Sequence, residues 1–414
     1  MGYLLDELTA RGVISIDRAA KPARDRGTGR PSHQVSVAPT APAVIAVHLG
    51  TDTATVATVG LGAQVLRRDD MPLRRPIGAG EVLDRLCALA ARQARAHPWV
   101  LAMGIAVPSP VRRDGFAAAP LHLGWPAMPL GELLADRLRR IQPLSTLVLR
   151  LGNDANLAAL AEHRHGSGRG SGQLLYLTTA HIGLGGALVS GGRLFDGAHG
   201  YAMEPGHITV DPAGSACSCG STGCLEVEAD HRGLLRAAGQ EAAGPHDVAQ
   251  AAASVLDAAA TGDPRARRAV DHVAARLGSG LASLVNLTDP DRIVLAGSLA
   301  RYHELASDPV TRSLSARSFL THAEPVTIST GAVPGAPLIG AAEVAFQALL
   351  DNPRATLRTQ RAGAGAYARQ EQGDRLPPGR GHGTRPPKAD SEVPETSRAR
   401  LGPRVGRAPA QRGP

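Results

Sequence analysis

A histidine followed by three closely spaced cysteines constrains the fold of this chain more than any other feature. His207 precedes Cys217, Cys219 and Cys224, and two glycines lie between the last two cysteines. One imidazole and three thiolates make the closed four-ligand shell that zinc prefers in structural sites, and glycine permits the tight turns between such ligands. Three cysteines within eight residues are poorly explained as small buried side chains. The spacing therefore predicts a structural zinc site, without the open position that metal-assisted hydrolysis requires.

The composition narrows the class of protein further. The chain has 414 residues, of which 3% are aromatic, too few for the base-stacking surfaces of single-strand nucleic-acid binding. Four cysteines in this length do not form a disulfide framework, and Cys87, alone in a helical pattern, is expected to be an inert core residue. Met1–Val13 lacks the apolar core of a signal peptide, and no stretch has the sustained apolarity of a membrane span. We expect a cytoplasmic protein with no membrane partner.

The net charge of +8 is concentrated at the C-terminal end of the chain. Pro353–Pro414 holds thirteen Arg or Lys and five Asp or Glu, so the remaining residues sum to a neutral body. Arg, Pro, Gly and Gln dominate this segment, which has too few apolar side chains to offset the entropy of ordering. We therefore expect residues 352–414 to be a disordered basic tail. It is either a non-specific contact for nucleic-acid phosphates or a solvated extension, and the interrupting acidic residues favour the extension.

Strand and helix patterns alternate along the chain in two successive halves. In the first half they are Ala43–Val59 (a strand that turns at Gly50-Thr51-Asp52 and returns), Glu81–Ala96, Val100–Val107, Leu130–Arg140, Leu147–Leu151 and Asp154–His163. In the second half they are a strand from Gln173, a turn at Gly183–Gly186, Ala187–Val189, Arg265–Leu287, Arg292–Leu295 and Gly340–Leu350. This alternation predicts an α/β fold with two lobes, residues 41–165 and 166–351, and a cleft between them. The final helix is free to pack back on the first lobe.

Four segments carry further motifs. They are G-I-A-V-P-S-P-V from Gly104, L-G-W-P-A-M-P-L from Leu123, G-N-D-A-N-L-A-A-L-A-E from Gly152, and G-G-R-L-F-D-G-A-H-G-Y-A-M-E-P-G-H from Gly191. Together with the cysteine motif, they resemble the ROK family, which groups bacterial sugar kinases with sugar-responsive repressors. The resemblance covers Ala43 to Leu350, and the cysteine motif is its most specific part. It implies an α/β, two-lobed actin-like (ribonuclease H-like) ATPase/sugar-kinase fold with a small structural zinc motif and a sugar in the cleft.

The resemblance also implies which side chains contact the sugar. The family's sugar contacts correspond here to Asn153, Asp154, Glu204, His207 and Glu226. Carboxylates and an amide pair with adjacent hydroxyls, and a buried site built in this way rejects ligands that lack those hydroxyls. His207 would then serve twice, with one ring nitrogen on zinc and the other on the sugar. Without the motif, Glu204 and Glu226 would be interpreted as surface charges or helix-start residues.

The positions expected to bind a nucleotide depart from the pattern of the family's kinases. The degenerate remains of that site are Gly50, Thr51, Gly183, Gly185, Gly186 and Gly297. His48 stands where those kinases carry an acidic residue beside the metal, and Thr51 stands in place of a glycine that phosphate would approach. His181-Ile182-Gly183 and Ala296-Gly297-Ser298 likewise replace glycine-rich loops. Asp154 keeps the position of the general base, so it is catalytic, and ATP and Mg²⁺ are cofactors, only if the protein is a kinase.

The N-terminal segment favours a regulator. Residues 1–40 are expected to be the remnant of a winged-helix DNA-binding domain plus its linker, since L-L-D-E-L-T-A-R-G-V-I, a basic loop (Arg18–Pro31) and G-R-P-S resemble the end of that domain in ROK repressors. The front of the domain is expected upstream of Met1, through a truncation or a late start codon. The alternative is that Tyr3–Ile16 is simply an N-terminal helix. Operator DNA is a partner only if a complete winged helix exists, and paired half-sites would require a homodimer or homotetramer.

The sequence therefore predicts a ROK-type sugar-responsive transcriptional regulator, or its truncated sensor core, that binds a small-molecule sugar between two lobes. The alternative is an ATP-dependent sugar kinase of the same family, with Asp154 as general base. A third, weaker hypothesis is a remnant that only oligomerises.

Overall fold

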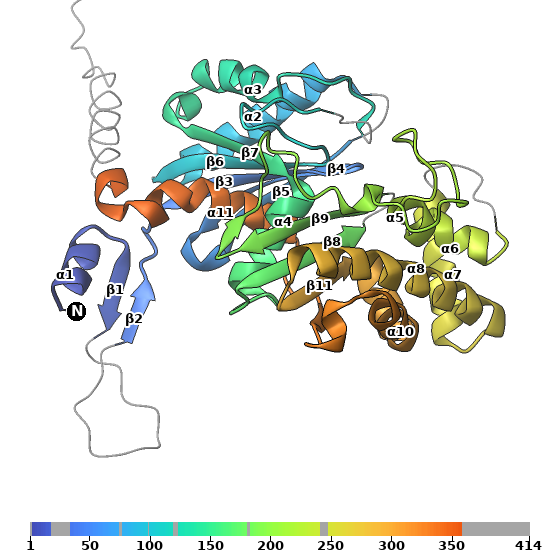
Figure 1. Ribbon diagram of the computed structural model, residues 1–414. Helices are drawn as coiled ribbons and strands as arrows, with labels where there is room; N and C mark the ends of the chain where they lie inside the picture. The colour runs from blue at the N-terminus through green and yellow to red at the C-terminus, as the bar shows by residue number, and fades with distance from the viewer. Residues whose placement is uncertain are drawn as a thin grey trace, which may run out of the picture. The chain divides into compact units, whose positions relative to one another are not determined.

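The computed structural model describes residues 2–17, 34–73, 77–97, 99–118, 123–179, 183–240 and 247–357. Figure 1 shows their arrangement. The expected basic loop at Arg18–Pro31, the pair His181-Ile182 and residues 358–414 lie outside these ranges. Within them, every helix is too short or too polar to cross a bilayer.

The first sheet has five strands in the order β5-β4-β3-β6-β7. They are β3 (Ala43–Leu49), β4 (Thr53–Gly60), β5 (Val65–Pro72), β6 (Val100–Val107) and β7 (Val148–Asn153). β3 pairs antiparallel with β4, and parallel with β6, as a hairpin followed by crossover helices requires. The sequence predicts this hairpin, β6 and β7, but it misses β5, an edge strand whose side chains are largely exposed. Both faces of this edge strand are largely exposed to solvent, so its sequence lacks the apolar alternation from which strands are predicted.

The second sheet repeats the first. Its strands are β8 (Gln173–Thr179), β9 (Gly185–Ser190), β10 (Arg193–Leu194), β11 (Arg292–Gly297) and β12 (Thr327–Thr330). They follow the order β10-β9-β8-β11-β12, with an antiparallel β8–β9 hairpin and parallel β8, β11 and β12. The two sheets thus share one topology, third-second-first-fourth-fifth. β10 and β12 are too short to give a sequence pattern.

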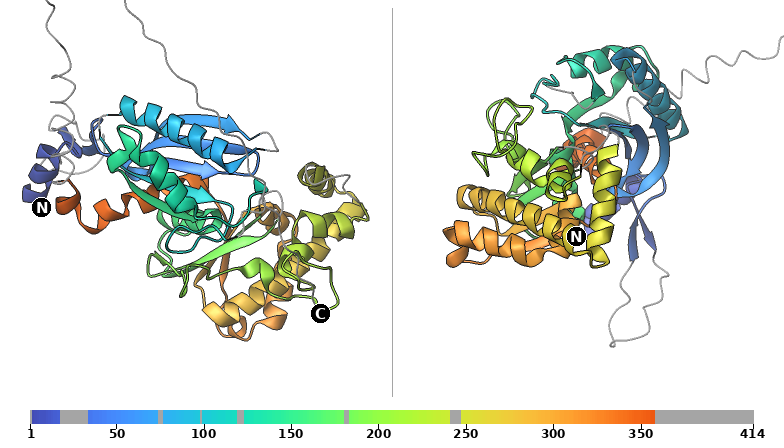
Figure 2. Two further views of the ribbon diagram at one scale, coloured as in Figure 1. Left: turned by 90° about the horizontal axis from the view of Figure 1, so that it is seen from above. Right: turned by 90° about the vertical axis from the view of Figure 1, so that its right-hand side faces the viewer.

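Helices cover both faces of both sheets, and two of them lie between the sheets (Figures 1 and 2). α2 (Ala79–Ala96) and α3 (Leu130–Arg139) pack on the outer face of the first sheet. α4 (Asp154–His165) and α11 (Ala336–Asp351) contribute to the core clusters on the inner faces of the two sheets. The outer face of the second sheet is covered by α5 (Leu225–Ala229), α6 (His231–Ala237), α7 (Asp247–Ala260), α8 (Pro264–Thr288), α9 (Ser298–Leu305) and α10 (Ser307–Arg317). Of these six, the sequence predicts only α8.

Two glycines allow α11 to lie tightly between the lobes. A Cβ on Gly104 of β6 would lie 1.9 Å from the carbonyl oxygen of Ala341. A Cβ on Gly340 of α11 would lie 1.8 Å from the carbonyl oxygen of Leu157 on α4. Real side chains do not tolerate such contacts, so both positions require glycine. α11 is therefore in direct backbone contact with β6 and with α4.

A small helix–hairpin unit precedes the first sheet. It consists of α1 (Gly2–Ala10) and the antiparallel strands β1 (Ile14–Asp17) and β2 (Gln34–Val37). Val13 is buried in the same cluster as α11 and Leu357, and Arg354 lies 3.0 Å from Glu7. The sequence predicts that a helix begins this segment, as α1 does, and nothing in it predicts β2.

The expected start of the disordered tail at residue 352 is wrong for its first residues. Residues 353–357 are helical, and the Leu357 side chain is 2% exposed. The composition of the whole tail gives no sign that this one leucine is buried. Its burial against the N-terminal unit stabilises the helical turn that precedes it.

Candidate functional site

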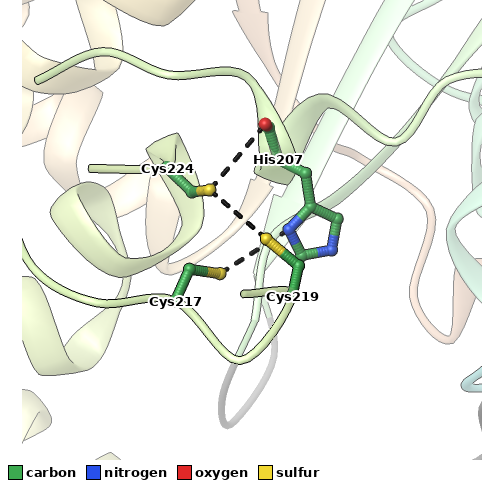
Figure 3. A group of neighbouring side chains, drawn as sticks. All are labelled: His207, Cys217, Cys219 and Cys224. Carbon is green, nitrogen blue, oxygen red and sulfur yellow. Dashed lines mark hydrogen bonds between the residues drawn. The ribbon is translucent and has the colours of Figure 1, made fainter. Parts of the chain in front are cut away.

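The four predicted zinc ligands converge. The ligand atoms of His207, Cys217, Cys219 and Cys224 all lie within 4.8 Å of one another (Figure 3). The Sγ atoms of Cys219 and Cys224 are 3.7 Å apart, and Cys217 Sγ is 3.7 Å from Nδ1 of His207. A tetrahedral zinc ion with bonds of about 2.0 Å to nitrogen and about 2.3 Å to sulfur gives edges of roughly 3.5 to 3.8 Å. The group therefore has the donor set and the dimensions to hold a metal ion.

Short backbone elements bring these ligands together. His207 ends the 3₁₀ turn Pro205–His207, and Cys224 is the N-cap residue of α5. Between them the chain folds back on itself, because Cys217 N donates to Ser221 O at 2.8 Å. Gly223 has φ +64°, and a Cβ there would lie 1.5 Å from the carbonyl oxygen of Asp211, so this turn depends on glycine.

The ring of His207 is oriented by the cysteines. Its Nδ1 faces the sulfur atoms, and the second ring nitrogen lies on the opposite side of the ring (Figure 3). Cys217 and Cys224 are buried, whereas Cys219 and His207 are exposed. A metal on Nδ1 would thus fix the ring and leave Nε2 available to another partner.

Asn153 and Asp154 start α4 at the carboxyl end of β7. Asn153 is the N-cap residue: its Oδ1 accepts from Asn156 N at 3.1 Å, and its Nδ2 donates to Ser109 O at 3.2 Å. Asp154 Oδ1 accepts from Ala155 N at 2.8 Å. Each side chain retains further hydrogen-bonding capacity, since a carboxylate and an amide have four sites each. Both residues therefore support the helix and remain able to contact a ligand.

Two carboxylates, Glu226 and Asp154, act electrostatically on a third, Glu204. Burial, together with the smaller effect of the charges of Glu226 and Asp154, raises the pKa of Glu204 to about 7. Burial also raises the pKa of Asp154 to about 6, against the hydrogen bond from Ala155. The Glu204 side chain is exposed to solvent, and the burial that raises its pKa comes from protein atoms beyond direct contact. The fold thus brings together three carboxyl groups from α4, the turn before His207, and α5.

The glycines expected to cradle a nucleotide are explained by local packing. Gly297 has φ +60°, and a Cβ there would lie 1.8 Å from the carbonyl oxygen of Thr179. A Cβ on Gly186 would lie 2.6 Å from Tyr176 O, one on Gly185 would lie 2.9 Å from Ala155 Cβ, and one on Gly50 would lie 2.8 Å from Thr53 O. These glycines serve strand pairing and turns, whether or not a phosphate approaches.

His48 lies on β3 before the first turn. Burial, together with the smaller effect of the charge of Arg68, lowers the pKa of His48 to about 4. The imidazole is therefore neutral at physiological pH and does not reproduce the charge of a carboxylate beside a cation. Thr51, the other substituted residue, lies in the turn between β3 and β4.

Asp230, His231 and Arg232 were not predicted from the sequence as site residues. Asp230 is fully buried, and Arg232 lies 3.2 Å from Glu226. The available signal was an N-cap: the Asp230 side chain accepts from the amides of Arg232 and Gly233 at the start of α6. That signal locates a helix start, but it does not reveal the contact with Glu226.

A cavity of about 580 Å³ lies beside β7, α3 and α11, and of the five expected sugar contacts only Asn153 lines it. Its lining includes Arg112, Arg150, Glu132 and Gln347. We assign the candidate site to the carboxylate cluster and not to this cavity, because only the cluster adjoins the Cys₃His group.

Two sheets of identical strand order, with α4 and α11 between them and a Cys₃His group beside three carboxylates, define an actin-like, two-lobed sugar-kinase fold. Residues 44–348 match the model of the ROK family. The chain belongs to this family.

Its relatives include both kinases and regulators. The chain is 30% identical over 289 residues to a glucokinase of Halalkalibacterium halodurans, covering 66% of this chain and 85% of that protein. It is 27% identical over 292 residues to a putative xylose repressor of a Caldicellulosiruptor species, covering 67% of this chain and 71% of the repressor. A ROK family transcriptional regulator, homologous to the E. coli MLC protein, has a similar fold, with a TM-score of 0.67, 22% identity and coverage of 84% of this chain and 88% of that one.

Proposed function

We propose that the protein is a ROK-type sugar-responsive transcriptional regulator, or the sensor core of one, and that it binds a sugar between its two lobes. The observation that carries the proposal is the helix–hairpin unit α1–β1–β2, which precedes the first sheet and packs on Leu357 through Val13. A helix followed by a two-stranded antiparallel ribbon is the order of elements that the C-terminal part of a winged-helix domain would have. The printed sequence between β1 and β2 holds four arginines and a lysine in Arg18–Arg30, as a segment that contacts DNA phosphates would.

The sugar would be held by Asn153, Asp154, Glu204, His207 and Glu226. Several carboxylates, an amide and an imidazole nitrogen offer both acceptors and donors for a ring of hydroxyl groups. Zinc on the Cys₃His group would be structural: it would fix the segment between Pro205 and Cys224, which holds His207 and is flanked by Glu204 and Glu226.

Two features of the first hairpin favour sensing over phosphoryl transfer. Phosphoryl transfer requires cations and donors to stabilise charge on the transferred group. His48 is neutral at physiological pH, since burial lowers its pKa to about 4, and it therefore does not attract Mg²⁺ as a carboxylate would. Thr51 adds a β-branched side chain to the turn that follows.

In this proposal, residues 41–165 and 166–351 are the two lobes, and residues 1–40 are part of the DNA-binding end. α11 contacts both lobes and leads to Leu357, so it connects the sugar site with the helix–hairpin unit. A sugar that favours one lobe arrangement would bias the DNA-binding end through this helix. Operator DNA with paired half-sites would call for a homodimer or homotetramer.

An ATP-dependent sugar kinase is the second candidate, and Asp154 favours it. Burial raises the pKa of its carboxyl to about 6, which suits a general base that works near neutral pH. The kinase relatives add to this support.

An assay coupled to ADP release separates the candidates. Wild type and Asp154→Asn would be incubated with Mg-ATP and each of D-glucose, D-xylose, N-acetyl-D-glucosamine and N-acetyl-D-mannosamine. The regulator proposal predicts no turnover above the sugar-free rate for either protein. Turnover by wild type that vanishes in Asp154→Asn would establish the kinase instead.

A further inference from the structure

Three consecutive residues at the start of α6 connect this helix to three other segments around the carboxylate cluster. Asp230, His231 and Arg232 each make one of these connections. The segments contacted are the turn before β9, the start of α9 and the first turn of α5, at Gly183, Ser298 and Glu226 respectively. The three side chains together form one hydrogen-bonded network that joins α6 to these segments.

Asp230 is the anchor of this network. Its side chain is fully buried, and its Oδ1 accepts from Arg232 N at 2.8 Å and from Gly233 N at 3.2 Å. Its Oδ2 accepts from Arg232 Nε at 2.7 Å, and Gly183 N lies 3.5 Å away. A buried carboxylate with backbone donors on one oxygen and a guanidinium on the other has a fixed position.

Arg232 links the fixed carboxylate of Asp230 to that of Glu226. Its guanidinium is a rigid, planar fork, and Nη2 donates to Glu226 Oε1 at 3.2 Å while Nε remains on Asp230. The other oxygen of Glu226 lies 3.4 Å from Leu184 N. Glu226 is thus held from two sides, with one donor on each oxygen, and each oxygen keeps a lone pair for a ligand hydroxyl.

The negative charges of the three carboxyl groups favour a cation beside Glu226. The carboxyl groups of Asp154, Glu204 and Glu226 repel one another, which contributes to the raised pKa of Glu204. Arg232 is in contact with Glu226, and its side chain is 32% exposed, whereas that of Glu226 is 13% exposed. A partly buried guanidinium offsets this repulsion more effectively than an exposed one.

We propose that Arg232, fixed by buried Asp230, is a positioning residue that orients the Glu226 carboxylate for sugar binding. The inference rests on the proposed function, because Glu226 as a sugar contact is part of that proposal. Arg232 acts through Glu226 and need not touch the sugar.

Isothermal titration calorimetry with D-glucose, D-xylose and N-acetyl-D-glucosamine tests the proposal on the full chain. Arg232→Gln is expected to weaken the affinity for the sugar that binds wild type by about 10-fold or more, since a misplaced carboxylate leaves a hydroxyl unpaired. The matched control is Arg301→Gln, which removes an exposed ion pair with Asp257 on the same lobe and should leave affinity unchanged.

A double-mutant cycle distinguishes positioning from a merely structural role. If Arg232 acts through Glu226, then Arg232→Gln should have little further effect in a Glu226→Gln background. Full additivity of the two losses would overturn the proposal. If Glu226→Gln itself leaves affinity at the wild-type value, the sugar-contact assignment fails; if Glu226→Gln weakens binding but Arg232→Gln does not, only the present inference fails. No heat with any of the sugars overturns both.

Two further variants keep the test valid if Arg232→Gln is unstable. That variant leaves Asp230 buried without its cation, which should lower the melting temperature by roughly 5 °C or more. Asp230→Asn combined with Arg232→Gln removes both charges and keeps an N-cap residue, so stability should recover while sugar affinity stays low. Arg232→Lys keeps the charge but loses the fork, and it should also bind sugar more weakly. Wild-type affinity in both of these variants would overturn the proposal.

Discussion

Glu7 and Arg354 are 347 positions apart in the sequence, and their side chains lie 3.0 Å apart. The hydrogen bond from Arg354 lowers the pKa of Glu7. The contact joins α1 to the residues that follow α11, beside the buried side chain of Leu357. The beginning and the end of the described chain are therefore part of one unit.

Leu357 should contribute far more to this docking than Arg354 does. Leu357→Ala is expected to destabilise the helix–hairpin unit by roughly 2 to 4 kcal/mol, because the side chain is buried and leaves a cavity. Hydrogen exchange of the β1 amides would measure the effect. Arg354→Ala is the control: its ion pair is largely exposed and should be worth less than about 1 kcal/mol. Equal protection of β1 in wild type and Leu357→Ala would show that the unit is held elsewhere.

The Cys₃His group should bind one zinc ion per chain. Cys224→Ser is expected to lose the metal and several degrees of thermal stability, because a closed shell of four ligands stabilises the segment that it joins. Metal content and melting temperature would be measured together. Cys87→Ala is the matched control: Cys87 is buried on α2, away from this group, and burial raises the pKa of its thiol to about 11. Equal zinc content in wild type and Cys224→Ser would contradict the assignment.

Asp154 should make the protein less stable as the pH rises. Its pKa is about 6 in the folded chain, above the ordinary value of 3.8, so the folded state binds the proton more tightly than the unfolded state does. Stability from this group is present below about pH 4 and is lost as the pH rises through 6. Asp154→Asn removes the ionisation, and its stability relative to wild type should be higher at pH 7.5 than at pH 5 by about 1 to 1.5 kcal/mol. Urea unfolding at the two pH values measures this gain. A difference between the proteins that does not change with pH would show that burial does not raise this pKa.

Gly297 should not tolerate a side chain. Gly297→Ala places a Cβ 1.8 Å from Thr179 O at φ +60°, and we expect a loss of about 3 kcal/mol or more. Gly335→Ala is the control: its φ is +63°, but no atom lies within 4 Å, so only backbone strain of about 1 kcal/mol applies. Chemical denaturation would compare them. Similar losses in the two variants would mean that the contact with Thr179 relaxes freely.

The sequence predicts the parts of the molecule whose signal is local. His207 and the three cysteines identify themselves by residue type and spacing, and the buried strands β3, β6, β8 and β11 have continuous apolar patterns. The edge strand β5 has no apolar pattern because its side chains are largely exposed. The helices α5 and α6 are too short, at five and seven residues, to show a helical period.

The network at Arg232 was not predictable for a different reason. Its partners Glu226 and Asp230 lie close in sequence, but both contact Arg232 only because the chain bends between α5 and α6 at Asp230, which is the C-cap of α5 and the N-cap of α6. Such a contact depends on tertiary geometry and has no periodicity. The burial of Leu357 was not predicted either, because it also depends on tertiary contacts and one leucine does not change the composition of a basic tail.

Binding measurements on the wild-type chain test the central claim most directly. Calorimetric titrations with the hexoses and the pentose named above, and with a non-hydrolysable ATP analogue plus Mg²⁺, would be compared under identical conditions. A sugar sensor should give saturable heat with at least one sugar and none with millimolar nucleotide. Tight nucleotide binding, or silence with every sugar, would contradict it.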